Sequence, residues 1–290
     1  MAGIIDIIGN TPLVEIQKLN PNPNVKIYAK LEGNNPGGSV KDRASLNMIR
    51  SAIERGDIKQ GTKLIEATSG NTGIALAMIA RLFGLEIELV MPSNSTRERT
   101  LTMEAYGAKV TLLEGIELCR DYAEEKGATE GYFLLNQFAN PDNYMAHVKT
   151  TGPEIWRDTE GKITHFVSAM GTTGTIMGCS RYFKDQNKDI QIIGCQPTEG
   201  SSIPGIRRWP EAYLPKIFDA SRVDRVMDIS EAEATQMARE MAKTEGIFAG
   251  MSSGGALSAA IKLAAELKEG VIVFICCDRG DRYLSSDLFG

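Results

Sequence analysis

Short apolar runs rich in valine and isoleucine alternate with longer helical stretches along the chain, and this pattern constrains the fold most. A strand buried on both faces is a continuous apolar run, and two parallel strands need a crossover helix between them. The apolar runs lie at 25–31, 64–67, 86–91, 109–113, 164–169, 190–195 and 271–276, and helical spacing covers 41–55, 72–83, 97–106, 143–157, 173–184, 231–245 and 253–267. The alternation predicts an α/β fold with parallel sheets flanked by helices.

The length and charge of the chain narrow its class further. At 290 residues it lies where a single core stops growing, so we expect one or two α/β lobes. A net charge of −5 with no basic stripe disfavours binding to nucleic acid or to an anionic membrane surface. We therefore expect neither as a partner.

Cysteine usage and the N-terminus indicate the compartment. The five cysteines form no C-x-x-C pair and only two histidines are present, so we expect reduced thiols and no metal site. The N-terminus has no basic segment leading into a long apolar one, and the chain has no 18-residue apolar run. We expect a cytoplasmic protein without a membrane span.

The loop at 37–43 places Lys41 in the first turn of a predicted helix, after a pair of glycines. The positive end of the helix dipole disfavours an ammonium there, so burial would lower the lysine pKa. A neutral amine at that position can form a Schiff base. The alternative is an ordinary surface lysine, with Asp42 and Arg43 as a solvated charge group.

The loop at 68–73, Thr-Ser-Gly-Asn-Thr-Gly, lies between a predicted strand and a predicted helix. Hydroxyl groups and backbone N–H groups converge at such a helix start, which suits a carboxylate. The amide of Asn71 can also donate a hydrogen bond to a phenolate oxygen. The alternative is a well-capped turn without a ligand.

The loop at 171–175, Gly-Thr-Thr-Gly-Thr, also follows a strand and precedes a helix. Its glycines allow close backbone approach, its threonines add donors, and the helix start favours a phosphate dianion. It matches neither G-x-G-x-x-G nor the Walker pattern. The alternative is a simple helix cap.

A fourth loop, at 250–255, opens another helix, where one serine can serve as a cap while its neighbour projects into a cleft.

In this order and spacing, the four loops resemble those of the fold type II pyridoxal 5′-phosphate (PLP) enzymes, in particular the cysteine synthase (O-acetylserine sulfhydrylase) family. The resemblance covers essentially the whole chain. The shared motifs lie at 8–13, 30–32, 35–36, 39–43, 68–73, 136–138, 151–156, 171–175 and 279–283. The segments 200–209 and 277–283 resemble the B type of the family more than the A type. The B type is associated with bulkier or more anionic sulfur donors.

This resemblance implies an α/β fold of two lobes, each a mostly parallel twisted sheet flanked by helices. The smaller lobe would cover about 37–143 and the larger one 1–36 with 144–290, with PLP in the cleft between them. The implied reaction is β-replacement on O-acetylserine or O-phosphoserine by sulfide or thiosulfate. It gives L-cysteine or S-sulfocysteine through an aminoacrylate. The resemblance also implies a homodimer, whereas binding of serine acetyltransferase belongs mainly to the A type and is not expected.

The resemblance also assigns residues. Lys41 would carry PLP and shuttle the proton, Asn71 would donate to the phenolate oxygen, and Ser252 would face the pyridine nitrogen. A hydroxyl does not stabilise a protonated ring as an aspartate does, which favours elimination over a long-lived carbanion. The phosphate would be bound by Gly171, Thr172, Thr173, Gly174 and Thr175, and the substrate carboxylate by Thr68, Ser69, Gly70, Thr72 and Gln137.

Two neighbouring arginines, Arg207 and Arg208, are candidates for binding an anionic sulfur donor or a phosphoserine-like acceptor. The alternative is a structural role, with one of them stacked on Trp209. Rival functions are a cystathionine β-synthase-like or serine dehydratase-like PLP enzyme, and a non-catalytic PLP-binding regulatory subunit whose cleft docks a peptide.

Overall fold

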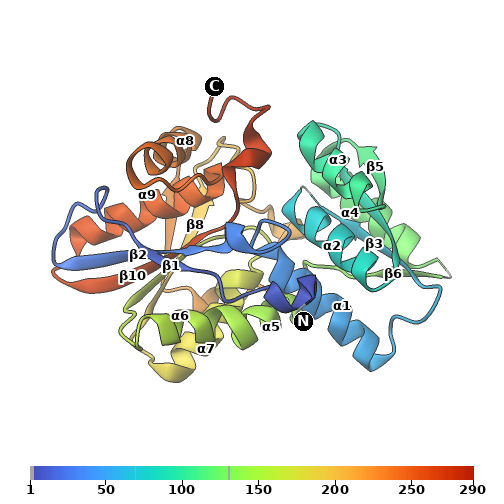
Figure 1. The fold of residues 1–290 in the computed structure, drawn as a ribbon, viewed down its shortest axis with the longest axis horizontal. Coiled ribbons are helices and arrows are strands. Elements are labelled where there is room, and N and C mark those ends of the chain that lie inside the picture. The colour runs from blue at the N-terminus through green and yellow to red at the C-terminus, as the bar shows by residue number, and fades with distance from the viewer. Residues whose placement is uncertain (1–2, 69, 130) are drawn as a thin grey trace.

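The larger of two sheets has six strands and contains both the first and the last strand of the described chain (Figure 1). The computed structural model describes residues 3–68, 70–129 and 131–290. All neighbouring strands of this sheet are parallel except the first pair. The order is β1 (Leu13–Glu15), β2 (Val25–Leu31), β10 (Gly270–Cys276), β7 (His165–Ala169), β8 (Gln191–Pro197) and β9 (Arg225–Ile229).

Helices cover both faces of this sheet, which explains why its central strands β7 and β10 are buried over most of their length. Alternate residues of β10 point to opposite faces. Phe274 packs in a cluster with α9, and Val273 packs in a second cluster with α7. The helices above and below the sheet in Figure 1 are α8 (Glu231–Glu240) and α9 (Met251–Glu266), and α5 (Pro141–Ala146), α6 (Gly152–Asp158) and α7 (Gly174–Gln186).

The smaller sheet has four parallel strands in the order β5 (Lys109–Leu113), β4 (Glu86–Pro92), β3 (Lys63–Ala67) and β6 (Tyr132–Leu134). It is also covered on both faces: Leu64 packs in one cluster with α2, and Ile65 packs in another with α4. The helices on this side are α1 (Lys41–Arg55), α2 (Asn71–Leu82), α3 (Arg97–Ala105) and α4 (Gly115–Gly127).

The predicted α/β class with mostly parallel sheets is confirmed, while the lobe boundaries at 37 and 143 stay a prediction. The predicted apolar runs all form strands, but three short strands, β1, β6 and β9, were not predicted. The first two have only three residues each, and β9 is an edge strand with two buried positions. Helix α4 was also missed, although its buried residues Ile116, Cys119 and Ala123 have helical spacing.

Two helices predicted as single segments contain π turns, at His147–Thr151 and at Met241–Glu245. Within the described ranges, no helix is both long and apolar enough to cross a membrane. The same part of the chain contains no cluster of three or more metal-binding side chains.

Candidate active site

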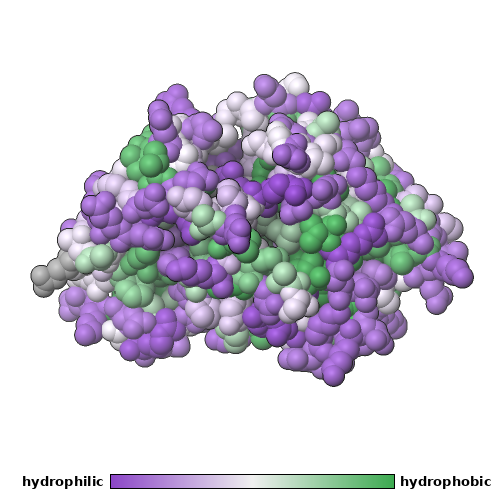
Figure 2. Space-filling model, turned by 180° about the vertical axis from the view of Figure 1, so that it is seen from behind, coloured by the Kyte–Doolittle hydropathy of each residue, from purple (hydrophilic) through white to green (hydrophobic). Residues whose placement is uncertain are grey.

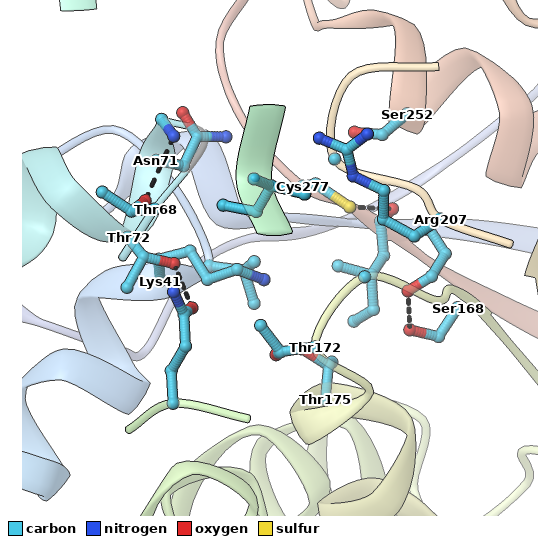
Figure 3. A pocket seen from close by; sticks show the side chains of 18 of the residues that line it. Lys41, Thr68, Asn71, Thr72, Ser168, Thr172, Thr175, Arg207, Ser252 and Cys277 are labelled. Carbon is cyan, nitrogen blue, oxygen red and sulfur yellow. Dashed lines mark hydrogen bonds between the residues drawn. The ribbon is translucent and has the colours of Figure 1, made fainter. Parts of the chain in front are cut away.

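Loops from the carboxyl ends of strands in both sheets meet in one pocket (Figure 3). This edge is where ligands bind in parallel α/β sheets. The loops after β3, β7 and β10 contribute, together with the starts of α1 and α9. Among the lining residues are Lys41, Thr68, Gly70, Asn71, Thr72, Gln137, Gly171, Thr172, Thr175, Arg207 and Ser252, all of which the sequence predicted.

Lys41 is the first residue of α1, and its side chain extends into this pocket (Figure 3). The turn before it is fixed because the Val40 N–H donates to the Cys277 carbonyl at 2.9 Å. Burial lowers the pKa of Lys41, and the nearby Cys277 and Asp278 oppose this only partly. The lysine is therefore more readily neutral than an exposed lysine, as a Schiff-base amine must be.

Cys277 lies beside Lys41 in the pocket, and the sequence did not single it out as a site residue. Burial raises the pKa of its thiol to about 12. The thiol therefore stays protonated near neutral pH and is a poor nucleophile.

The residues after Lys41 are buried, so their interpretation as a solvated charge group is wrong. The Arg43 guanidinium binds the Glu32 and Glu154 carboxylates, with N–O distances of 2.6–2.8 Å. The Asp42 carboxylate accepts a 2.5 Å hydrogen bond from the Gly37 N–H. These contacts fix the start of α1 and with it the position of Lys41.

The loop at 171–175 has the backbone shape that a phosphate site needs. Thr173 adopts a left-handed φ of 69° directly before α7. A Cβ at Gly171 would lie 2.6 Å from the Gly205 carbonyl oxygen, and one at Gly174 would collide with the Asn143 side chain. Both positions therefore need glycine.

Polar groups of this loop are available to a ligand. The hydroxyl oxygen of Thr173 is buried and has no hydrogen-bond partner among the described residues. Thr172 and Thr175 line the pocket. Since buried polar atoms are normally paired, the unpaired hydroxyl at a helix start fits an additional acceptor group such as a phosphate. Thr173 and Gly174 belong to this loop but do not line the pocket themselves.

Asn143 and His147 contact the loop at 171–175, and neither was predicted as a site residue. The Asn143 amide donates to the Gln137 carbonyl at 2.7 Å and to the Thr172 hydroxyl at 3.2 Å. The His147 ring lies 3.4 Å from the Thr175 hydroxyl. Burial holds the pKa of His147 well below its usual value, so the ring is neutral.

The two serines at the start of α9 have different partners. The Ser253 hydroxyl accepts a 2.8 Å hydrogen bond from the Cys277 N–H and so secures the end of β10. Ser252 is buried and lines the pocket instead. The loop pattern alone left open which serine faces the cleft, whereas the resemblance assigned Ser252, and in the structure it is Ser252 that lines the pocket (Figure 3).

The loop after β3 and the segment after β6 are bonded to each other. The Thr72 hydroxyl donates to Gln137 Oε1 at 2.8 Å, and Gln137 Nε2 donates to the Ala67 carbonyl at 2.7 Å. The Thr68 hydroxyl accepts from the Gly70 and Gly73 N–H groups at 3.1 and 3.2 Å. Ser69, which the sequence also predicted, lies outside the described residues.

Glu66, the residue before this loop in β3, is a buried carboxyl group that sequence reasoning missed. Its oxygens lie 3.4 Å from the Gln137 N–H. Burial raises its pKa to about 8, although three backbone N–H groups and Arg120 act in the opposite direction. Glu66 therefore supports the backbone that carries Gln137.

The structure separates the two adjacent arginines. Arg207 lines the pocket, and its N–H donates to the Met170 carbonyl at 2.9 Å. Arg208 departs from the expectation: it is not among the lining residues, and its guanidinium donates to Asp228 at 2.6 Å on the surface. The arginine stacked beside Trp209 is Arg120, whose guanidinium carbon lies 5.7 Å from the ring centroid.

The side chain of Asn71 is hydrogen-bonded to residues near the C-terminus. Its amide donates to Asp278 Oδ2 at 2.6 Å and accepts from Arg282 at 2.6 Å. Arg99 and Tyr283 also line the pocket. Neither was predicted as a site residue: Arg99 lies in a polar helix without a recognisable motif, whereas Tyr283 belongs to the shared motif at 279–283, which was the available signal.

Comparisons with known proteins agree on one family. The model of the pyridoxal-phosphate dependent enzyme family matches residues 4–278. The chain is 58% identical to cysteine synthase B of Pseudomonas aeruginosa over 99% of its length and 97% of the relative. It is 56% identical to cysteine synthase B of Escherichia coli, over 100% and 97%.

A solved structure is similar over the same range. It is the O-acetylserine sulfhydrylase isoform 3 of Entamoeba histolytica, with a TM-score of 0.92 and 39% sequence identity. The match covers 100% of this chain and 91% of that one.

Proposed function

Because the chain belongs to the pyridoxal-phosphate dependent enzyme family, and within it to the cysteine synthases, we propose that it makes L-cysteine from O-acetylserine and sulfide. One observation carries this proposal. A lysine with a lowered pKa, a glycine-threonine loop that presents Gly171, Thr172 and Thr175, and a buried serine lie around the same pocket. These three features suit the amine, phosphate and ring-nitrogen partners of PLP.

The residues that would hold the cofactor come from different parts of the chain. Lys41 would bind it covalently, the backbone and hydroxyls of 171–175 would bind its phosphate, and Asn71 would donate to its ring hydroxyl. When bound, PLP supplies an electron-withdrawing ring that acidifies the substrate Cα–H and allows acetate to leave from Cβ. With its amine free, Lys41 would be the base that removes the Cα proton and later returns it.

Ser252 would set the strength of that ring as an electron sink. Its hydroxyl can hydrogen-bond to the ring nitrogen without a negative charge, so it does not hold the nitrogen protonated as an aspartate would. Ser252 is buried, which keeps competing water from that position. This environment favours elimination and replacement at Cβ over chemistry that needs a long-lived carbanion.

The substrate carboxylate would bind at the start of α2. Backbone N–H groups at a helix start and the hydroxyls of Thr68 and Thr72 are suitable donors, with Ser69 and Gly70 in the same loop. Gln137 would support this site, because it is bonded to Thr72 and to the Ala67 carbonyl. A carboxylate bound here orients the Cα–H bond without any arginine from that loop.

Arg207 would allow the enzyme to use thiosulfate as a sulfur donor and O-phosphoserine as the amino-acid substrate. A guanidinium binds planar or tetrahedral oxyanions with two parallel hydrogen bonds. Arg207 lines the pocket and is half-buried, and this burial lowers the pKa of its guanidinium. Arg208 is engaged with Asp228 and is not part of this proposal.

We further infer a homodimer that acts in the cytoplasm. Large apolar side chains such as Ile7 and Leu118 are exposed, and Figure 2 shows apolar residues gathered in patches on one face. Patches of this kind mark contact surfaces. All five cysteines are free, as expected for a reducing compartment.

The proposed function is tested by a matrix of acceptors and donors. The purified protein, loaded with PLP, is incubated with O-acetylserine, O-phosphoserine or serine, each with sulfide, thiosulfate or homocysteine. Formation of cysteine from O-acetylserine and sulfide is the expected result. Cystathionine or pyruvate as the main product would contradict it, and so would the absence of any product from a protein that binds PLP.

A further inference from the structure

The segment Asp278–Tyr283 follows β10 and lies beside the pocket, but the proposed reaction gives it no role. It begins with Asp278, which is buried, and continues into a short 3₁₀ helix at Gly280–Tyr283. Its side chains contact residues that flank the smaller sheet. Asn71 is the first residue of α2, and Arg99, from α3, lies with its guanidinium carbon 5.1 Å from the Tyr283 ring centroid.

The amide of Asn71 has a partner from this segment at each end. Its Nδ2 donates to Asp278 Oδ2 at 2.6 Å, and its Oδ1 accepts from Arg282 Nη1 at 2.6 Å. An ionised carboxylate only accepts and a guanidinium only donates, so the reverse orientation of the amide would lose both bonds. Asp278 and Arg282 together therefore select a single orientation.

Asp278 is itself held in place. Its Oδ2 accepts a second hydrogen bond, from the Tyr283 hydroxyl at 2.6 Å, and its backbone pairs with that of Ser39. The carboxylate thus cannot turn away from Asn71 without breaking the contact within its own segment. This restraint makes Asp278 a fixed acceptor.

Arg282 also reaches the turn that precedes Lys41. Its guanidinium donates to the Gly37 carbonyl, and a Cβ at Gly38 would collide with it. Gly38 has a φ of 79°, which further favours glycine at that position. One guanidinium therefore joins the Asn71 amide to the Lys41 turn.

We propose that Asp278 and Arg282 are positioning residues that orient the Asn71 amide toward the cofactor. The inference rests on the proposed function, because it concerns the group that Asn71 would bind. With one Nδ2 hydrogen bonded to Asp278, the second Nδ2 hydrogen is the donor left for the cofactor's ring oxygen. An amide released by either residue can rotate and present its oxygen instead, which repels an anionic ring oxygen.

The test compares Arg282→Ala with Arg279→Ala, a matched control from the same turn. Arg279 is exposed and paired with Asp281 at 3.1 Å, so its loss leaves the Asn71 amide untouched. Equilibrium dialysis measures the PLP dissociation constant, and absorbance records the visible band of the bound cofactor and its pH titration. We expect Arg282→Ala to weaken PLP binding on the order of tenfold and to shift the band, as loss of a group that orients a ligand-binding side chain commonly does.

A double variant separates positioning from general support. In the Asn71→Ala background, adding Arg282→Ala is expected to change the PLP dissociation constant much less than it does in the wild type, because the side chain it orients is gone and only its contact with the Gly37 carbonyl is lost. Equal dissociation constants and spectra for Arg282→Ala and Arg279→Ala would overturn the proposal. Fully additive effects in the double variant would overturn it as well.

Further variants keep the proposal testable if Arg282→Ala does not fold. Arg282→Lys retains a charge and loses the paired donors, and Asp278→Asn removes the charge and replaces one acceptor oxygen by an NH2 donor with almost no change in volume. Circular dichroism establishes folding, and both variants are expected to weaken PLP binding more than Arg279→Ala does. The wild-type protein is assayed alongside: if it binds PLP but makes no cysteine, the proposed function fails while the positioning result still stands.

Discussion

Replacing Arg207 should lower kcat/KM for thiosulfate more than kcat/KM for sulfide. Arg207→Ala removes a largely desolvated guanidinium from the pocket, while its backbone bond to Met170 remains. A hydrogen bond to a charged group is worth about 1.5–3 kcal/mol. At about 1.4 kcal/mol per factor of ten, kcat/KM for thiosulfate should fall between about 10- and 150-fold. Sulfide has no oxygen atoms to bind, so its kcat/KM should fall less than about threefold.

Arg208→Ala is the matched control for this experiment. Its ion pair with Asp228 is exposed, with side-chain exposures of 41% and 52%, and such pairs contribute about 0–1 kcal/mol. Steady-state rates are measured for wild type and both variants with O-acetylserine and each donor in turn. An equal loss with sulfide and thiosulfate in Arg207→Ala would refute donor recognition, and a donor-selective loss in Arg208→Ala would refute the assignment to Arg207.

Three further predictions concern the site and its support. Lys41→Ala should abolish turnover together with the visible absorbance of the bound cofactor, and turnover that persists in the variant would contradict its role as base. Arg43→Met leaves the buried Glu32 carboxylate without its ion-pair partner, while Glu154 keeps Lys30 at 2.9 Å, and should lower the free energy of unfolding by about 3–5 kcal/mol in urea titrations; a loss below about 1 kcal/mol would contradict the pairing. The folded-state pKa of Glu66 is about 8, above the ordinary value of 4.5, so the folded chain binds the extra proton and this group reduces stability as pH rises between the two values. Glu66→Gln should therefore flatten the fall in stability over that range, and identical pH profiles for the two proteins would argue against a raised pKa.

Local pattern was sufficient for much of the fold. Short runs rich in apolar residues, such as 25–31 and 109–113, predicted strands with the bounds that the structure shows, although the second is an edge strand without a fully buried residue. The same reasoning missed β6, whose three residues are apolar but too few to mark a strand. It also failed for α4, whose apolar stripe is narrow.

By itself the sequence determined the class of the fold, the loops that open helices and the resemblance to PLP enzymes, because each depends on residues close together in the chain. Only the tertiary structure decided which side chains of those loops share a pocket. Arg207 rather than Arg208 faces it because Asp228 binds the latter, and Ser253, unlike the Ser252 that the resemblance assigned, is engaged by the Cys277 N–H. The partners of Asn71 lie more than 200 residues away in the chain, and spacing carries no information about contacts that folding alone creates.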